Sequence, residues 1–209
     1  MNTRNARKIF TILAAANPAP TTELIYSNNF ELLIAVILSA QATDKQVNKV
    51  TAKLFAVANS PKAMFELGEE TIRLYIKSLG LYRSKAKNIW QTAKILTEKY
   101  PSNFPNTHQQ LQELPGVGRK TANVVLNTAF GKPYIAVDTH VKRVSQRIGL
   151  SDARNLLDLE QDLYTIIPKK FLKNAHHWLI LHGRYICKAR NPSCDDCAIK
   201  PYCLFKNPE

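Results

Sequence analysis

The sequence is short of acidic residues. Asp and Glu number 16 among 209 residues, against 29 Lys and Arg, and the formal net charge at pH 7 is +13. Each Lys or Arg that neutralises a phosphate releases condensed counterions, so an excess of this size favours binding to polyanions. A generically basic protein, or one that touches acidic lipid, would show the same excess. Charge alone therefore favours a nucleic-acid partner without proving one.

Long hydrophobic runs are absent. The longest apolar stretch, Phe30 to Leu38, contains Glu31 and is too short to cross a bilayer. The apolar run from Ile9 to Ala16 follows basic residues and superficially imitates a secretory signal, but it is short and has no clear cleavage site. An amphipathic helix explains this run better, with four residues on one face: Ile9, Ile12, Leu13 and Ala16. We therefore expect a cytoplasmic protein with no membrane partner, and nothing in the sequence demands more than a monomer.

Strand signals are scarce, and only Tyr134 to Val137 looks strand-like. Helical periodicity dominates instead. From residue 85 to 100 one helical face is apolar, and its residues are Ala86, Ile89, Trp90, Ala93, Leu96 and Tyr100. The lysines of this segment are expected on the solvent side: Lys85, Lys87, Lys94 and Lys99. Similar patterns occur in 31–40, 45–57, 120–130, 139–149, 156–166 and 173–186. The sequence predicts an all-α fold of about ten short helices.

Cysteine is absent before position 187. All four cysteines then follow in the pattern C-x6-C-x2-C-x5-C, and they are Cys187, Cys194, Cys197 and Cys203. Disulfides are rare in the cytoplasm, so this clustering indicates a metal site. Zinc usually pairs two short C-x2–4-C segments, and a single C-x2-C favours an iron–sulfur cluster, although the spacing leaves both open.

Two further groups of polar residues lie near the cysteines. The loop cations are Lys188, Arg190 and Lys200, which can either face DNA or simply be solvated. The histidines just upstream are His176, His177 and His182. Because four thiolates suffice for a metal site, we expect these histidines to be packed or hydrogen-bonded rather than metal ligands.

A glycine-containing turn joins two helical segments at residues 114–118. It reads Leu-Pro-Gly-Val-Gly, and we assign Leu114, Pro115, Gly116, Val117 and Gly118 to it. Its glycines allow close approach of a backbone, and the amides that begin the next helix can bind a phosphate oxygen. Arg119 and Lys120 add positive charge there. A plain helix–helix turn is the alternative, but in so basic a chain we expect the turn to hold DNA without reading its bases.

Lys120 lies in the first turn of the helix after this hairpin. The positive helix end and Arg119 both disfavour a protonated amine, and a neutral lysine can form a Schiff base with an aldehyde-like carbon. A lysine at a helix start is otherwise an ordinary solvated charge. Asp138 follows the strand-like segment and is expected, by itself, to be a helix N-cap. The residues alone do not pair Lys120 with Asp138.

Four motifs together resemble the bacterial endonuclease III family. They are Leu-Pro-Gly-Val-Gly-Arg-Lys-Thr-Ala at 114–122, Val-Asp-Thr-His-Val at 137–141, the cysteine pattern, and Leu-Leu-Ile-Ala-Val-Ile-Leu-Ser-Ala-Gln-Ala-Thr-Asp at 32–44. The resemblance runs in order from about Thr21 to Cys203. Many DNA-binding proteins share the hairpin, but the complete set is specific.

The resemblance implies a bifunctional DNA glycosylase and AP lyase that acts on double-stranded DNA with oxidised pyrimidines or abasic sites. Lys120 is then the nucleophile that attacks C1′ of a nucleotide turned out of the helix, and Asp138 assists. The strand is cut 3′ to the lesion. Gln41 is implied to fill the gap left by the nucleotide, and Leu81 to wedge into the base stack. The four cysteines are implied to carry a [4Fe-4S] cluster.

The implied architecture has two helical domains that flank a DNA-binding groove. One is a six-helix barrel at 22–132, with the helix-hairpin-helix at about 108–127. The other combines 1–21 with 133–209 and contains the cluster loop 187–203.

Some residues depart from the family pattern, and two rival functions share part of it. Lys142 replaces a common apolar residue, and Asn191 and Ser193 stand where basic residues are frequent, which puts the DNA contact of the cluster loop in question. A monofunctional adenine glycosylase shares the hairpin and cysteines but normally lacks the lysine. A non-enzymatic, cluster-containing DNA-binding regulator needs no pair of Lys120 and Asp138.

Overall fold

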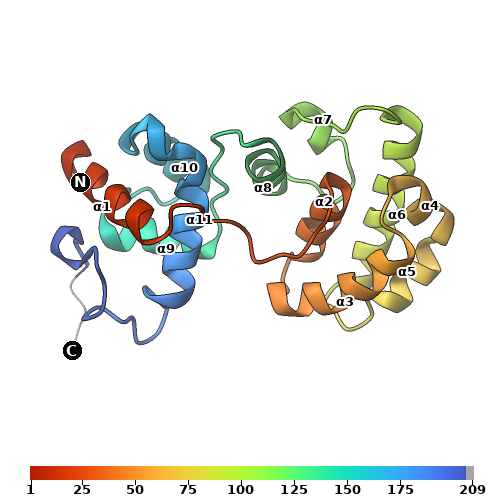
Figure 1. Ribbon diagram of the computed structural model, residues 1–209, viewed down its shortest axis with the longest axis horizontal. Helices are drawn as coiled ribbons and strands as arrows, with labels where there is room; N and C mark the ends of the chain where they lie inside the picture. The colour runs from red at the N-terminus through yellow and green to blue at the C-terminus, as the bar shows by residue number, and fades with distance from the viewer. Residues whose placement is uncertain (206–209) are drawn as a thin grey trace. The chain divides into compact units, whose positions relative to one another are not determined.

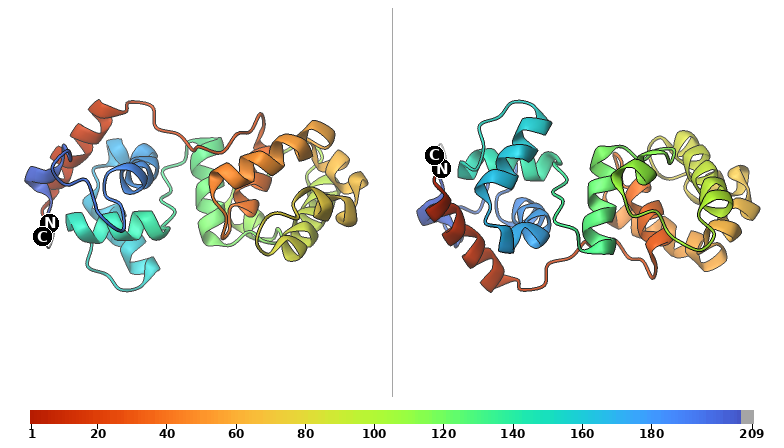
Figure 2. Two further views of the ribbon diagram at one scale, coloured as in Figure 1. Left: turned by 90° about the horizontal axis from the view of Figure 1, so that it is seen from below. Right: turned by 90° about the horizontal axis from the view of Figure 1, so that it is seen from above.

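The computed structural model describes residues 1–205 (Figure 1). In this range the regular elements are eleven α-helices and one short 3-10 helix, without a strand, which confirms the predicted all-α class (Figure 2). None of the described helices is long and apolar enough to span a bilayer. The chain divides into two compact units, a continuous one, Glu23–Phe130, and a discontinuous one, Met1–Thr22 with Gly131–Glu209.

The continuous unit is built around a fully buried helix. Its elements are α2 (Asn29–Leu38), α3 (Asp44–Val57), α4 (Pro61–Leu67), α5 (Glu69–Tyr75), α6 (Tyr82–Lys99), α7 (His108–Gln112) and α8 (Arg119–Phe130). All residues of α2 from Phe30 to Leu38 are buried, as its apolar composition predicts, and α2 packs against α3, α6 and α8. Glu31 is tolerated there because its carboxylate accepts a hydrogen bond from the Ser27 amide at 2.6 Å. The sequence did not predict α4 and α5, which have seven residues each and are too short to show two turns of periodicity.

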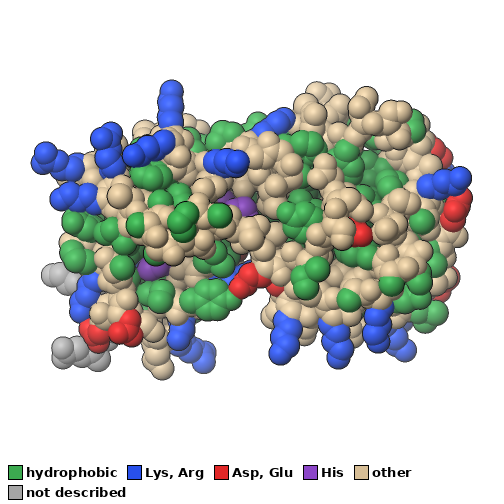
Figure 3. Space-filling view, viewed as in Figure 1, with side chains coloured by type: hydrophobic (Ala, Val, Ile, Leu, Met, Phe, Trp, Pro, Cys, Tyr) green, Lys and Arg blue, Asp and Glu red, His purple; other side chains and the backbone are tan. Residues whose placement is uncertain are grey.

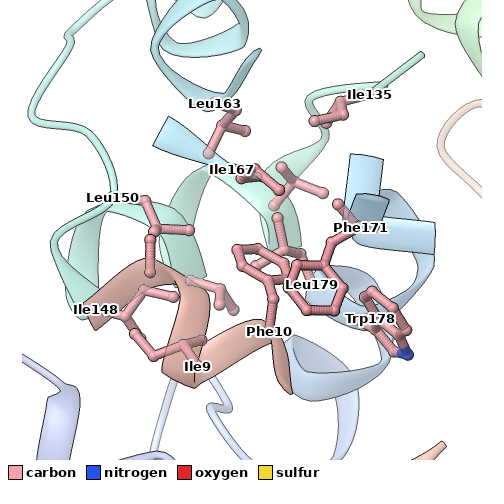
Figure 4. Close-up of a cluster of buried hydrophobic side chains, with 14 of the residues drawn as sticks. Ile9, Phe10, Ile135, Ile148, Leu150, Leu163, Ile167, Phe171, Trp178 and Leu179 are labelled. Carbon is pink, nitrogen blue, oxygen red and sulfur yellow. The ribbon is translucent and has the colours of Figure 1, made fainter. Parts of the chain in front are cut away.

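The discontinuous unit brings the N-terminal helix onto the C-terminal half of the chain. It contains α1 (Thr3–Ala16), α9 (Thr139–Ile148), α10 (Leu156–Ile166), α11 (Lys169–Tyr185) and the 3-10 helix η1 (Lys200–Tyr202). Phe10 of α1 lies against Phe171 and Trp178 of α11, with ring centroids 6.0 and 6.2 Å apart (Figure 4). Ile9 and Phe10 are buried, but Ala16, which was expected on the same face, is exposed because it ends the helix.

The surface carries the predicted excess of positive charge, and Lys and Arg outnumber acidic side chains on the face shown in Figure 3. One lysine was placed wrongly by the sequence. Lys87, Lys94 and Lys99 of α6 are exposed as expected, whereas Lys85 is only 4% exposed. The buried stripe of α6 passes through Lys85, Ala86, Ile89, Thr92, Ala93 and Leu96. With 3.6 residues per turn, position 85 therefore belongs to the core face.

Candidate functional site

Two buried apolar side chains anchor the hairpin between α7 and α8 to the core of the continuous unit. Leu114 and Val117 are buried, and the Val117 amide donates to the Leu114 carbonyl at 3.1 Å. Gly116 and Gly118 stay exposed. The sequence therefore separates this turn into two buried anchors and two accessible glycines, and the backbone at the glycines remains open to a ligand.

Helix α6 contacts the same hairpin through two of its side chains. The Thr92 hydroxyl donates to the Pro115 carbonyl at 3.1 Å. Gly116 has φ +80°, and a Cβ there would meet Asn88 Nδ2 at 2.9 Å. The positive φ at 116 therefore favours glycine, and a larger residue would also require the Asn88 side chain to shift. Sequence reasoning missed Asn88 and Thr92, and only their spacing of four on one helix offered a signal.

Helix α8 presents its positive end beside the hairpin. It has no acidic residue in its first turn, and Arg119 and Lys120 are both exposed there. The Gly118 carbonyl accepts the first helical bond, from the Ala122 amide at 3.0 Å. Ala122 is buried on the opposite face, so the helix is anchored while Lys120 is accessible. Backbone amides and two cations at one point suit an anionic ligand.

Gln41 and Leu81 share an unusual backbone conformation. Their φ values are +54° and +58°, and Asn191 is the third non-glycine residue with positive φ in the described part of the chain. Both are exposed, Leu81 by 56%. Their loops approach each other, because a Cβ at Gly80 would lie 3.7 Å from the Gln41 carbonyl. Strain at two adjacent exposed loops is typical of residues held for function.

Asp138 lies in the discontinuous unit, at the start of α9. Its Oδ1 accepts a hydrogen bond from the Val141 amide at 2.7 Å, which makes Asp138 the N-cap of that helix, as expected from its sequence context. The segment before it is buried at Ile135, Ala136 and Val137, and the Ile135 amide donates to the Tyr164 hydroxyl at 3.0 Å. Lys120 belongs to the continuous unit, so the pairing of Lys120 with Asp138 stays a prediction.

Two arginines of α9 hold the loop that carries the first cysteine. Arg143 donates to the carbonyls of Cys187 at 3.1 Å and Gly183 at 2.7 Å. Arg147 donates to the Lys188 carbonyl at 2.6 Å, to the Ala189 carbonyl at 3.0 Å and toward Cys187 Sγ at 3.6 Å. These arginines were not predicted as site residues. Their spacing of four places them on one face of α9, directly after the Asp-Thr-His motif.

The four cysteines are free thiols that share one electrostatic environment. Burial raises the pKa values of the Cys197 and Cys203 thiols. Cys187 and Cys194 raise the pKa of Cys197 further, and these two together with Cys197 raise that of Cys203. Backbone amides of Ile199 and Lys200 oppose this at Cys197, and that of Phe205 does so at Cys203. Amides directed at sulfur stabilise thiolates, the form that binds metal.

Four cysteine thiols form a donor set that suits a metal centre. Among the residues that the structure describes, no three His, Cys, Asp or Glu side chains are grouped to hold one metal ion. Four thiolates are the ligands of a four-iron cubane, in which each thiolate binds a different iron, and also of some structural zinc sites. The donor set therefore fits an iron–sulfur cluster by its chemistry.

The histidines near the cysteines are buried, as expected, and they are His176, His177 and His182. Burial lowers the pKa values of His177 and His182 to about 4. His182 Nε2 also lies 3.7 Å from Cys197 Sγ, so it is a hydrogen-bonding neighbour of a cysteine.

The charged residues of the cluster region are largely on the surface. Lys188 and Arg190 are exposed, and Lys200 pairs with Asp195 at 2.8 Å. Lys142, which departs from the family pattern, donates to the Arg154 carbonyl at 3.3 Å. It therefore contributes to a local turn contact.

Comparison with known proteins supports the resemblance. Residues 34–169 match the HhH-GPD superfamily of base excision DNA repair proteins. Endonuclease III of Rickettsia conorii (strain ATCC VR-613 / Malish 7) is 58% identical over 205 residues, 98% of each chain. Endonuclease III of Escherichia coli (strain K12) is 55% identical over 206 residues, 99% of this chain and 98% of the relative. The chain belongs to the endonuclease III family.

A solved structure of endonuclease III trapped as a covalent intermediate with DNA is also similar. It has a TM-score of 0.90 and 44% sequence identity, and the match covers 98% of this chain and 96% of that one. Membership of the endonuclease III family makes the chain a base-excision repair enzyme, a DNA glycosylase with AP-lyase activity that binds damaged DNA. The non-enzymatic regulator is thereby ruled out, and the relatives favour endonuclease III over an adenine glycosylase.

Proposed function

We propose that this enzyme removes oxidised pyrimidines of the thymine glycol type with Lys120 as its nucleophile. The observation that carries the proposal is the accessible amine of Lys120 in the first turn of α8, directly behind the glycine hairpin. A phosphate held by the hairpin amides would bring a sugar of the same strand near this amine. The covalent DNA intermediate of a similar endonuclease III is consistent with such a nucleophile.

The chemistry assigned to Lys120 proceeds through a Schiff base. Its Nζ lone pair attacks C1′, the bond from C1′ to the damaged base breaks, and the base leaves with that electron pair and takes up a proton. Loss of a proton from nitrogen and opening of the sugar ring give an imine between Lys120 and C1′. Removal of a C2′ proton then expels the 3′ phosphate, and the strand is cut 3′ to the lesion.

Asp138 is assigned a supporting role. Its carboxylate would stabilise the positive charge that develops on the sugar, or accept a proton during the attack by Lys120. The N-cap bond uses Oδ1, one of its two oxygens, and fixes the orientation of the carboxylate. A fixed carboxylate needs little reorganisation when charge develops beside it.

Gln41 and Leu81 are assigned the role of inserting into the DNA double helix. Leu81 would enter the base stack and Gln41 would occupy the space left by the extruded nucleotide. Their exposure, their strained backbones and the approach of their loops support a joint action. The hairpin residues, Leu114 to Gly118 with Arg119, would hold the strand by its backbone.

The cysteines are assigned to a [4Fe-4S] cluster with Cys187, Cys194, Cys197 and Cys203 as ligands. Four thiols that act on one another's pKa values and backbone amides directed at sulfur support this choice. A bound cluster supplies iron–thiolate bonds that fix loop 187–203. Purified protein should be brown and contain iron, and metal analysis that finds only zinc would refute the cluster.

A trapping experiment tests the proposed function. With an oligonucleotide that contains thymine glycol, borohydride should reduce the imine to a stable protein–DNA adduct, and Lys120→Ala should form none. Absence of an adduct from the unsubstituted protein, with DNA binding intact, would overturn the lysine chemistry. Because chromosomal DNA is the substrate, we also place the enzyme in the bacterial cytoplasm with the nucleoid.

A further inference from the structure

Lys85 has a buried amine that the proposed chemistry does not use. The residue is 4% exposed, and its Nζ has no hydrogen-bond partner among the residues that the structure describes. Burial lowers the pKa of Lys85. An unpaired buried cation is costly, and proteins seldom keep one without a use for the charge.

The surroundings of Lys85 increase this cost. It lies in the first turn of α6, which has no acidic residue and no side-chain cap at its N-terminus. The helix end is itself positive. Nearby, Arg83, Lys77 and Arg73 all act to lower the pKa of Tyr82, which shows that the start of α6 is electropositive. Both the backbone amides that begin this helix and the nearby cations favour binding of an anion.

The position of Lys85 relates it to the predicted DNA contacts. Its amide donates to the Leu81 carbonyl at 3.0 Å, so it begins one turn after the proposed wedge. Gly80 approaches the Gln41 carbonyl on that side. One turn further along α6, Asn88 packs against Gly116 of the hairpin. Lys85 therefore stands on the strip of α6 that connects the wedge loops to the hairpin, and helical side chains lean toward the N-terminus.

We propose that the first turn of α6, Tyr82–Lys85, is a second phosphate site of this enzyme, with Lys85 as its cation. This inference rests on the proposed function, because its ligand is a backbone phosphodiester of the DNA that Leu81 enters. The amides of the turn bind the phosphate oxygens, and the flexible stem of Lys85 brings the ammonium to the site when the phosphate arrives. The first turn of α6 would then be a third DNA contact, located between Leu81 and the hairpin.

The alternative is a purely structural Lys85 whose stem fills the core. The two roles predict opposite effects of removing the charge. If the ammonium has no partner until DNA binds, its removal eliminates an unpaired buried charge. The free protein then becomes no less stable, while its DNA binding weakens. If the ammonium is already compensated inside the protein, its loss lowers stability and leaves DNA binding unchanged.

Lys85→Met tests this, with Lys87→Met as the matched control because Lys87 is an exposed lysine of the same helix. The measurements are the melting temperature and the affinity for a duplex with a tetrahydrofuran abasic analogue at several salt concentrations. We expect Lys85→Met to keep or raise the melting temperature, to weaken binding about tenfold or more, and to lower the salt slope by about one. Lys87→Met should change affinity by no more than about threefold.

Two results would overturn the inference. One is binding by Lys85→Met as tight, and as salt-dependent, as that of Lys87→Met. The other is a substantial loss of stability or failure to fold, since it would show that the amine is already compensated. Borohydride trapping by the unsubstituted protein separates the two proposals. If that protein forms the adduct but Lys85→Met binds DNA normally, the phosphate site is wrong and the proposed function stands.

Discussion

Asp138 accepts the Val141 amide at 2.7 Å, so the proposed catalytic carboxylate is also the N-cap of α9. The cap and the charge can be separated by substitution. Asparagine caps a helix as well as aspartate but carries no charge. Asp138→Asn should therefore retain the free energy of unfolding and lose most glycosylase activity, whereas Asp138→Ala should lose activity and about 1 kcal/mol of stability. Urea denaturation and single-turnover base release measure the two quantities. Full activity in Asp138→Asn would show that the residue is only a cap.

The two hairpin glycines should respond differently to alanine. A Cβ at Gly116 meets Asn88 at 2.9 Å and the residue has positive φ, whereas a Cβ at Gly118 meets nothing within 4 Å. We predict that Gly116→Ala lowers the melting temperature, and that Gly118→Ala leaves it unchanged but weakens DNA binding, because its methyl group occupies the approach of the phosphate. Calorimetry and fluorescence anisotropy measure these effects. Normal DNA affinity in Gly118→Ala would place the phosphate elsewhere.

Leu81 combines an exposed apolar side chain with a strained backbone. We predict that Leu81→Ala slows base release, whereas Leu74→Ala, which truncates another exposed leucine of the same unit, does not. Leu81→Gly should slow base release as well and raise the free energy of unfolding by about 1 kcal/mol relative to Leu81→Ala, because glycine accepts positive φ. Equal rates in Leu81→Ala and Leu74→Ala would remove Leu81 from the mechanism.

Arg147 should control how firmly the cluster loop is held. It bonds to the carbonyls of Lys188 and Ala189 and reaches Cys187 Sγ. We predict that Arg147→Ala loses iron faster than the unsubstituted protein during a challenge with a chelator. Arg190→Ala, at an exposed arginine of the same loop, is the control and should lose iron at the normal rate. Equal rates for the two variants would show that the Arg147 bonds do not hold the cluster.

His177 should make the protein sensitive to acid. It is 7% exposed and its folded-state pKa is about 4, below the ordinary value of 6.5. Between these values the unfolded chain binds the proton and the folded chain does not, so stability present above pH 6.5 is lost as pH falls toward 4. The loss is up to about 3 kcal/mol. Denaturation curves at pH 7 and pH 5 should show a smaller decline for His177→Gln than for the unsubstituted protein, and an identical decline would contradict this origin.

Local sequence patterns were sufficient to predict much of this protein. The all-α class followed from periodicity, and the hairpin with its accessible glycines followed from Leu-Pro-Gly-Val-Gly. The burial of Leu114 and Val117 was not predicted. Asp138 was recognised as a cap because capping depends on neighbours in the sequence. Helices α4 and α5 were missed because seven residues do not establish a period.

Contacts between distant segments could not be predicted in this way. The bonds of Arg143 and Arg147 to the cysteine loop join residues about forty positions apart. Lys85 was expected in solvent because charged residues usually are, although its 3.6-residue register placed it on the buried stripe of α6. The buried lysine violates a local preference, and such violations concentrate where proteins use a residue for function.

The most direct test of the account identifies the residue that is bound to DNA. The borohydride-reduced adduct with a thymine glycol duplex is digested with protease and nuclease, and the modified peptide is sequenced by mass spectrometry. The account predicts a deoxyribose remnant on Lys120, in the segment that follows Leu-Pro-Gly-Val-Gly. Modification at any other amine, with Lys120 unmodified, would contradict it.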